Sequence, residues 1–537
     1  MTPRSLTGTV HLVAVIARRD RVRLAIWLLC LTAFTLASVA ALPGLYPEAV
    51  DRQARAVLVQ NPGTRAISGP GYGLDDYTFG AMVGHEYLSW VAVFVALMSI
   101  FTVVRHTRLE EEAGRAELIR ASRVGRHAMT TAALAVAVGA NAVLAVLLAV
   151  GIGSLGIADV GWEGSVLFSA AVASTGVVFA AVAAVAVQVN ASARGANGLA
   201  GAVLVLAYTL RAAGDMAALG GNALSWLSPI GWAQQTRVYV DDRWWPLGLS
   251  AVAVVALVAA AYALSTRRDV GASLVPPRPG RAHARDGLTT PLGLAWRLHR
   301  SSVAWWSLAV GLFAVGYGTL ATEVERFVSE MSVIEDAVAD LGGTIIDAWL
   351  AIITLVFAVL ATVFAVVATV RARSEEVSGR AEALLATTSR RRWLASHLVV
   401  ALAGSALLMV LTGVGLGVSV ASSLGDGAYV TRVLGAALAH VPAIWLVIGI
   451  TVALYGVAPR ITPLAWAVVA YAGIVGWLGQ LLQFPQWALD LSPLGHTPLL
   501  PAEGMRWAPL VVLAVAAVAL VVVGQVTFAR RDIHSTA

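Results

Sequence analysis

Apolar residues are gathered into long, nearly unbroken runs, and short charged segments separate one run from the next. The runs are too long for strands and lack the alternation of apolar and polar positions that strands show. A helix that crosses a membrane needs about 20 apolar residues and satisfies its own backbone groups in lipid. The pattern therefore predicts an all-α membrane protein with twelve spans, at 24–42, 81–104, 128–152, 164–189, 198–213, 246–265, 303–320, 347–370, 394–420, 431–456, 462–480 and 508–528.

The second half of the chain repeats the first half. Four pairs of similar segments stand in the same order in both halves: EEAGRAEL at 111–118 and EVSGRAEAL at 376–384, SPIGW at 228–232 and SPLGH at 492–496, RWWPL at 243–247 and RWAPL at 506–510, and TRRDV at 266–270 and ARRDI at 529–533. Their offsets are 265, 264, 263 and 263 residues, so chance identity does not account for all four. The repeat predicts a fused pseudo-dimer of two six-span halves.

A stretch rich in proline, glycine and arginine, PPRPGRAHARDG at 276–287, lies between the halves and reads as a flexible linker. We therefore expect a first six-span domain at 1–270, a cytoplasmic linker at 271–290 and a second six-span domain at 291–537.

Composition and charge agree with a place in the membrane. The chain is 58% hydrophobic and 13% charged, with a mean hydropathy of +0.78, which excludes an ordinary soluble domain. With the N-terminus inside, 28 of the 37 arginines fall on the cytoplasmic side. By the positive-inside rule, we expect a multi-pass protein of the cell membrane whose two termini both lie in the cytoplasm.

Several function classes are disfavoured by what the sequence lacks. There is no lysine, and a P-loop needs the lysine of GxxxxGK to reach the terminal phosphates of ATP. HExxH and GxSxG motifs are also missing, and Cys30 is the only cysteine, which allows no intrachain disulfide. We expect no catalytic residue, metal or cofactor in this chain, and no nucleic-acid binding, because its basic charge follows from topology.

The charged segments after the second and eighth spans carry the most informative pattern. In both, acidic residues lead and arginines follow, which suits the dipole of a short helix at the membrane surface. Glu111 and Arg115 are four residues apart, as are Glu376 and Arg380, so each pair predicts an ion pair within one helix. A solvated connector made basic by topology is the plain alternative. The embedded glycine weighs against it, because a glycine costs about 1 kcal/mol in a helix interior and suggests close approach to another group.

The six-plus-six layout, the two ExxGRAE segments and the two SPxG segments together resemble the permease subunits of ABC exporters in the polyketide-antibiotic, tetronasin-like group. The resemblance covers essentially the whole chain. It implies that these two loops are coupling helices, seated on a separate, homodimeric ATP-binding subunit that is present in two copies per chain and holds ATP and magnesium. Carried over by motif, that role falls on Glu111, Gly114, Arg115, Glu117, Glu376, Gly379, Arg380 and Glu382. One departure is that Val377 stands where the first loop has Glu112.

The resemblance also implies a transport path for a hydrophobic or amphipathic substrate, lined by the second and fifth spans of each half. Candidate path residues are Trp90, Tyr208, Tyr471, Trp477 and Gln480, although aromatic residues in spans more often serve packing. The function expected is export of compounds such as antibiotics. The alternative is a proton-coupled major facilitator antiporter, which also has six plus six spans. Its loops are shorter, and the spans here lack an evident proton carrier.

Overall fold

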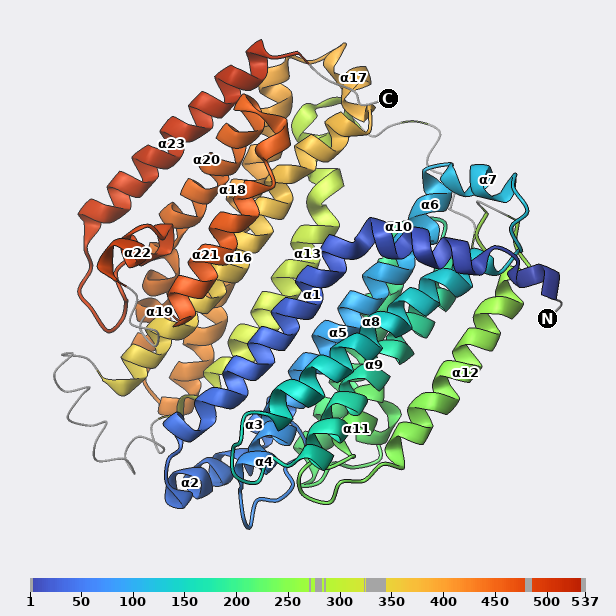
Figure 1. Ribbon diagram of the computed structural model, residues 1–537. Coiled ribbons are helices and arrows are strands. Elements are labelled where there is room, and N and C mark those ends of the chain that lie inside the picture. Colours follow the sequence, from blue (N-terminus) through green and yellow to red (C-terminus); the bar gives the residue numbers. More distant parts are fainter. Residues whose placement is uncertain are drawn as a thin grey trace. The chain divides into compact units, whose positions relative to one another are not determined.

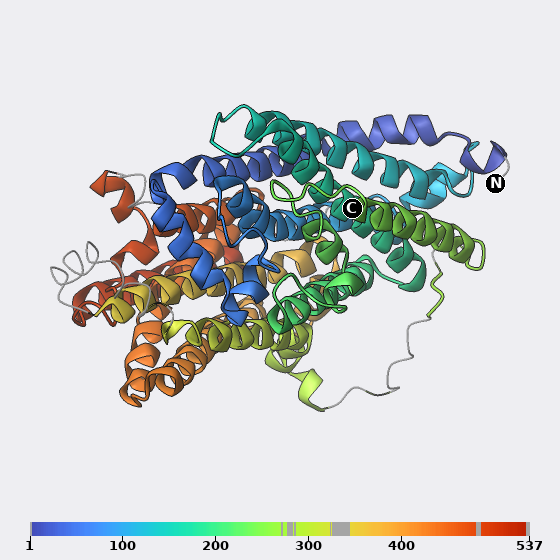
Figure 2. The ribbon, with the colours of Figure 1, turned by 90° about the horizontal axis from the view of Figure 1, so that it is seen from below.

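The computed structural model of the 537-residue chain describes residues 3–269, 272–275, 283, 286–322, 324, 344–478 and 485–532. Within these ranges the secondary structure is helical, without strands (Figure 1; Figure 2). The chain divides into two compact units, residues 1–279 and 280–537, which are described separately below.

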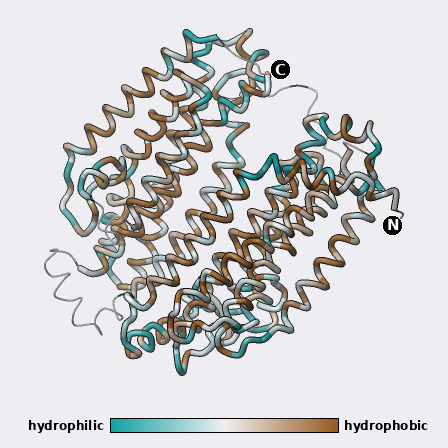
Figure 3. The backbone as a smooth tube through the Cα atoms, in the orientation of Figure 1, coloured by the Kyte–Doolittle hydropathy of each residue, from teal (hydrophilic) through white to brown (hydrophobic). Residues whose placement is uncertain are grey.

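Helices long and apolar enough to cross a membrane number eleven in the described ranges. Hydrophobic residues run along these helices and hydrophilic residues gather toward their ends (Figure 3). The remaining predicted span, 462–480, is represented by a helix at Leu464–Leu478, which is shorter than the roughly 20 residues that a span needs. Residues 479–484 lie outside the described ranges, so a count of twelve stays a prediction.

In the part of the first unit that the structure describes, there are six long helices and several short ones. The long helices are α1 (Thr9–Leu45), α5 (Leu88–Arg105), α8 (Ala128–Gly153), α9 (Trp162–Val189), α10 (Ala193–Ala217) and α12 (Pro246–Ser265). The short elements are η1 (Pro3–Leu6), α2 (Ala49–Val59), α3 (Pro62–Ser68), α4 (Phe79–Met82), the π-helix η2 (Val83–Tyr87), α6 (Arg108–Glu112), α7 (Arg115–Arg120), η3 (Ser225–Leu227) and α11 (Pro229–Gln234). Helices α6 and α7 lie at one end of the long helices, and α2, α3 and α11 lie at the other (Figure 1).

The second unit has a similar order of elements. Its longer helices are α13 (Pro291–Gly318), α16 (Ile345–Val377), α18 (Arg390–Leu424), α19 (Ala428–Ala439), α20 (Val441–Val457), α21 (Leu464–Leu478) and α23 (Trp507–Arg530). Its short elements are η4 (Asp286–Thr289), α17 (Arg380–Leu385), η5 (Pro459–Ile461), α22 (Gln486–Asp490) and η6 (Pro493–His496). Helices α19 and α20 together occupy the place in the order that α9 has in the first unit, with Pro442 just after the break between them.

When the long helices of each unit are numbered along the chain, the same pairs of helices pack together in both units. In the first unit α1 packs on α8, α5 on α9, α8 on α9, and α12 on α9. In the second unit α13 packs on α18, α16 on α20, α18 on α19, and α20 on α23. In both units the last long helix therefore rests on the fourth span in the order. The short charged loop in each unit joins the second long helix to the third.

Candidate functional site

The first charged loop (residues 105–127) contains two short helices, α6 and α7, that meet at Gly114. The second charged loop (residues 371–392) has the end of α16 and then α17, which meet at Gly379. Both glycines adopt the left-handed conformation, with φ of 70° and 73°, which glycine adopts without steric cost. A Cβ atom at either position would have no neighbour within 4 Å. The glycine therefore makes the turn between two helices. No group in the described part of this chain approaches it closely, so a close approach by a partner stays a prediction.

An ion pair closes each loop across this turn. Arg115 Nε donates to Glu110 Oε2 at 2.6 Å and its Nη2 donates to Oε1 at 3.2 Å. Arg380 makes the same two bonds to Glu375, at 2.8 and 3.2 Å. These hydrogen bonds to a carboxylate raise the pKa of both arginines above its usual value. The predicted pairing of each arginine with the glutamate four residues earlier is wrong, because the glycine ends the first helix and redirects the second.

Glu111 and Glu376 instead point inward, toward the chain that follows the last long helix of their unit. Arg268, just after α12, donates to Glu111 with Nη2 at 2.8 Å and Nη1 at 2.9 Å. Arg531, just after α23, donates to Glu376 at 2.8 and 2.6 Å. The carboxylate side chains are only 5% and 4% exposed. Buried pairs with two parallel hydrogen bonds are among the strongest polar contacts in proteins.

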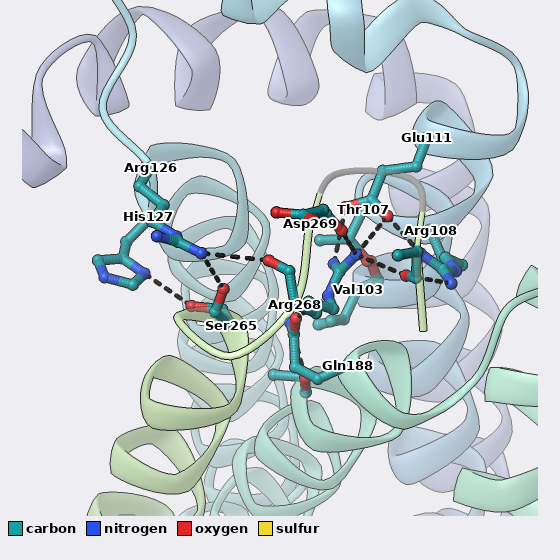
Figure 4. Close-up of polar contacts among 12 residues, drawn as sticks. Val103, Thr107, Arg108, Glu111, Arg126, His127, Gln188, Ser265, Arg268 and Asp269 are labelled. Atoms are coloured by element: carbon teal, nitrogen blue, oxygen red, sulfur yellow. Dashed lines mark hydrogen bonds and ion pairs between the residues drawn. The ribbon is translucent and has the colours of Figure 1, made fainter. Parts of the chain in front are cut away.

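A second arginine from each loop binds the same helix end. Arg126 Nη2 donates to the carbonyl oxygens of Ser265 and Arg268 at 2.9 and 3.1 Å. In the second unit, Arg390 Nη1 donates to the carbonyl oxygens of Arg531 and Ala529, at 2.5 and 3.4 Å. The last carbonyls of a helix have no partner within the helix, and a cation there is favoured by the helix dipole. Figure 4 shows this group around Arg268 and Ser265 in the first unit.

The two loops differ in their additional contacts. In the first unit, Arg268 Nε also donates to Gln188 of α9 at 2.6 Å. Glu112 accepts a hydrogen bond from the backbone nitrogen of Ala193 at 2.8 Å, which caps the start of α10. In the second unit, the hydroxyl of Tyr455 donates to Glu376, and Val377 is exposed where the first loop has Glu112. The loops therefore share their main ion pairs but present unequal surfaces.

The eight residues predicted to bind a partner differ in how far the structure exposes them. Glu111 and Glu376 are buried against arginines, and the glycines shape the turn. Arg115 and Arg380 lie at the surface, with side chains 46% and 60% exposed. Glu117 and Glu382 are exposed on α7 and α17, and Leu118 beside Glu117 is 76% exposed. The arginines, the second glutamates and Gly114 are therefore placed where a partner could contact them, whereas the side chains of Glu111 and Glu376 are not.

Comparison with known proteins identifies the family. Residues 10–264 and 288–529 match the family described as "Multidrug efflux system permease Rv1217c, C-terminal domain". The chain belongs to this family. It is also 40% identical over 537 residues to the multidrug efflux system permease protein Rv1217c of Mycobacterium tuberculosis (strain ATCC 25618 / H37Rv), and the match covers 98% of this chain and 96% of that protein. With its long apolar helices, this member of the efflux permease family is a multi-pass membrane protein.

The path residues predicted for this permease are only partly described by the structure. Trp90 is half-buried on α5. Tyr208 on α10 donates its hydroxyl to the carbonyl of Ile67 at 3.2 Å, and Tyr471 on α21 donates to the carbonyl of Ala488 at 2.5 Å. Trp477 belongs to α21, and Gln480 lies outside the described residues. Both tyrosine hydroxyls thus bind carbonyl groups of short helices, α3 and α22. A role of these residues in the transport path stays a prediction.

The permease has a buried charged group at the other end of its first unit. Arg211 on α10 is fully buried and contacts Asp215 at 3.3 Å, one helical turn later. Its Nη2 also donates to the carbonyl of Ala66 on α3 at 2.8 Å, and its guanidinium lies 4.4 Å from the ring centroid of Tyr208. Asp215 accepts a hydrogen bond from Ser225 at 2.6 Å. This cluster fastens α3, which precedes the second span, to the fifth long helix.

Four of the residues that organise the loops of this permease were missed as site residues at the sequence level. They are Arg126, Arg268, Arg390 and Arg531. A signal for two of them was present, since the matched segments TRRDV and ARRDI contain Arg268 and Arg531. The repeat marked the segments as equivalent, but only the structure brings each arginine to a glutamate more than 150 residues away.

Proposed function

We propose that this chain is the membrane-spanning subunit of an ABC exporter of the polyketide-antibiotic, tetronasin-like group. It moves hydrophobic or amphipathic compounds, such as antibiotics, out of the cell. A separate homodimeric subunit, two copies per chain, binds and hydrolyses ATP with magnesium. The membership of the chain in the multidrug efflux permease family supports the export role.

The observation that carries the ATP-driven part of this proposal is the matched construction of the two charged loops. Each has a left-handed glycine, an ion pair that closes the turn, and a short helix, α7 or α17. Two similar, surface-exposed helices in one chain suit a homodimeric partner, because equivalent surfaces can bind equivalent subunits. The family resemblance assigns ATP hydrolysis to that partner, and this chain has no lysine with which to build a P-loop.

The rest of the architecture follows from this proposal. The chain is an internal duplication, with six spans at 1–270 and six at 291–537, joined by a cytoplasmic linker at 271–290. The chain lies in the cell membrane, with both termini and both charged loops on the cytoplasmic side. This orientation follows from the excess of arginines in those segments. The substrate enters from the membrane or cytoplasm and leaves on the outer side.

Reversal of the exposed charges on α7 and α17 tests the docking role. We expect the double variant Glu117→Arg and Glu382→Arg to fold normally, because both side chains are exposed. It should lose the ATP-binding subunit, since reversed charges at an interface repel the partner's complementary groups. The measurement is copurification of an ATPase with the tagged chain from its native membrane in mild detergent.

The matched control is Glu163→Arg, the same charge change at an exposed position at the start of α9, the end of that helix remote from the loop. This control should retain the ATPase as the natural chain does. Equal recovery of the ATPase with the double variant and the control would mean that α7 and α17 are not the docking surface. Absence of any ATPase with the natural chain would contradict the proposed function itself.

A further inference from the structure

The end of the last long helix in each unit is held at two points by the charged loop. In the first unit, Glu111 from the start of the loop binds Arg268, and Arg126 from its end binds the carbonyls of Ser265 and Arg268. In the second unit, Glu376 binds Arg531, and Arg390 binds the carbonyls of Arg531 and Ala529. We name this arrangement the loop clasp.

Both contacts of the clasp are well suited to hold a helix end firmly. The carboxylate and the guanidinium bind through two parallel bonds, and Glu111 and Arg268 are 5% and 7% exposed. Screening by salt is weak for charges that are buried in this way. The second contact satisfies carbonyls that the helix itself leaves without a partner. Removal of Arg531 would leave the buried Glu376 without its cation, although the hydroxyl of Tyr455 still donates to it. Removal of Arg268 would leave Glu111 paired with Arg108 alone.

The helix that the clasp holds is largely exposed along its length in each unit. Of the 20 residues of α12, only Pro246, Ser250 and Ala261 are buried, and its main neighbour is α9. In the second unit, α23 rests mainly on α20 and is also largely exposed. Near its end, α12 is also hydrogen-bonded to the start of α8, where Tyr262 and Thr131 lie 2.8 Å apart and Ser265 and His127 lie 3.0 Å apart. In α23, Phe528 stacks on the rings of Trp393 and Tyr455. The clasp adds to these contacts the charged pairs that join the loop itself to the helix end.

Since both ends of the loop bind the same helix end, the loop cannot shift without moving that helix or breaking two contacts. We infer that Arg268 and Arg531 are positioning residues that carry the displacement of each partner-docked loop to α12 and α23. The inference rests on the proposed function, because it needs an ATPase that moves the loops. It assigns Glu111 and Glu376 to transmission inside the chain rather than to contact with the partner.

The test uses the purified complex of this chain with its ATPase in proteoliposomes. In the double variant Arg268→Ala and Arg531→Ala, we expect the ATPase to stay bound and active, because α7 and α17 are unchanged. Transport of a hydrophobic fluorescent dye per ATP hydrolysed should fall about tenfold, a typical size for coupling between two sites. The matched control is Arg267→Ala and Arg530→Ala, which removes the exposed arginine one position earlier in each unit.

A charge exchange separates coupling from simple loss of structure. Glu376→Arg with Arg531→Glu should restore more dye transport per ATP than either single reversal, because the pair is reformed with opposite polarity. The conservative variant Arg268→Lys and Arg531→Lys keeps the charge but loses the two-pronged geometry, and its transport per ATP should fall between the natural chain and the alanine variant.

Two results would overturn the inference while leaving the proposed function intact. One is an alanine variant that binds the ATPase and transports dye per ATP as well as the Arg267→Ala and Arg530→Ala control does. The other is an alanine variant that folds but no longer binds the ATPase, since the clasp would then shape the docking surface rather than transmit its motion. If the natural chain binds no ATPase, it is the proposed function that fails.

Discussion

Replacement of Arg211 by leucine is expected to destabilise the first unit by about 3–5 kcal/mol, the cost of breaking a buried ion pair by removing one partner. Arg211 and Asp215 are both fully buried, so the remaining carboxylate would lose its cation where water cannot replace it. The carbonyl of Ala66 on α3 would also lose its donor. The measurement is the melting temperature of the purified chain in detergent, followed by tryptophan fluorescence.

Two further variants serve as controls for Arg211→Leu. Arg243→Leu removes an arginine from a pair with Asp241 in which both side chains are more than a third exposed, and it should change stability by less than about 1 kcal/mol. Arg211→Leu combined with Asp215→Asn should be more stable than Arg211→Leu alone, because no unpaired charge remains. A melting temperature for Arg211→Leu equal to that of Arg243→Leu would contradict this role for the buried pair.

Glu111→Arg is expected to prevent the first unit from folding stably. The new guanidinium would lie between Arg108 and Arg268, whose side chains are 1% and 7% exposed. Three like charges in a buried site repel each other, and none of them would have a carboxylate to pair with, so the cost is several kcal/mol. The amount of monodisperse protein after size-exclusion chromatography in detergent measures the effect.

The comparison variant for Glu111→Arg is Glu117→Arg, the same change six residues later at an exposed position. It should yield a normal amount of protein. Glu111→Gln should lie between the two, because the glutamine fills the same space without adding a positive charge. A normal yield of Glu111→Arg with loss of the ATPase would mean that Glu111 faces the partner, contrary to the buried position described above.

Much of the architecture could be predicted from the sequence because lipid imposes a simple rule on it. Runs of about 20 apolar residues are a strong signal for spanning helices, and the structure has eleven such helices in its described ranges. The runs did not mark the true helix ends. Helix α1 begins at Thr9, whereas the apolar run begins at residue 24, because charged residues continue a helix beyond the membrane without an apolar pattern.

The sequence located the two charged loops but not the contacts within them. The ExxGRAE repeat located both loops, yet spacing alone favoured an ion pair between residues four apart. That pairing does not form, because Gly114 and Gly379 have a positive φ, which ends one helix and starts another. Contacts such as that of Glu376 with Arg531 depend on how helices far apart in the sequence pack together. A local sequence pattern does not predict which arginine will form an ion pair with a given acidic residue.

The most direct test of the central claim is the energy source of export. Inside-out membrane vesicles that contain the chain and its ATPase would be mixed with a hydrophobic fluorescent dye in the medium, with either ATP or an imposed pH gradient as the only driving force. The proposed function predicts that ATP drives dye accumulation, and that a protonophore leaves it unchanged. Accumulation driven by the pH gradient alone, without any effect of ATP, would contradict the account and favour a proton-coupled antiporter.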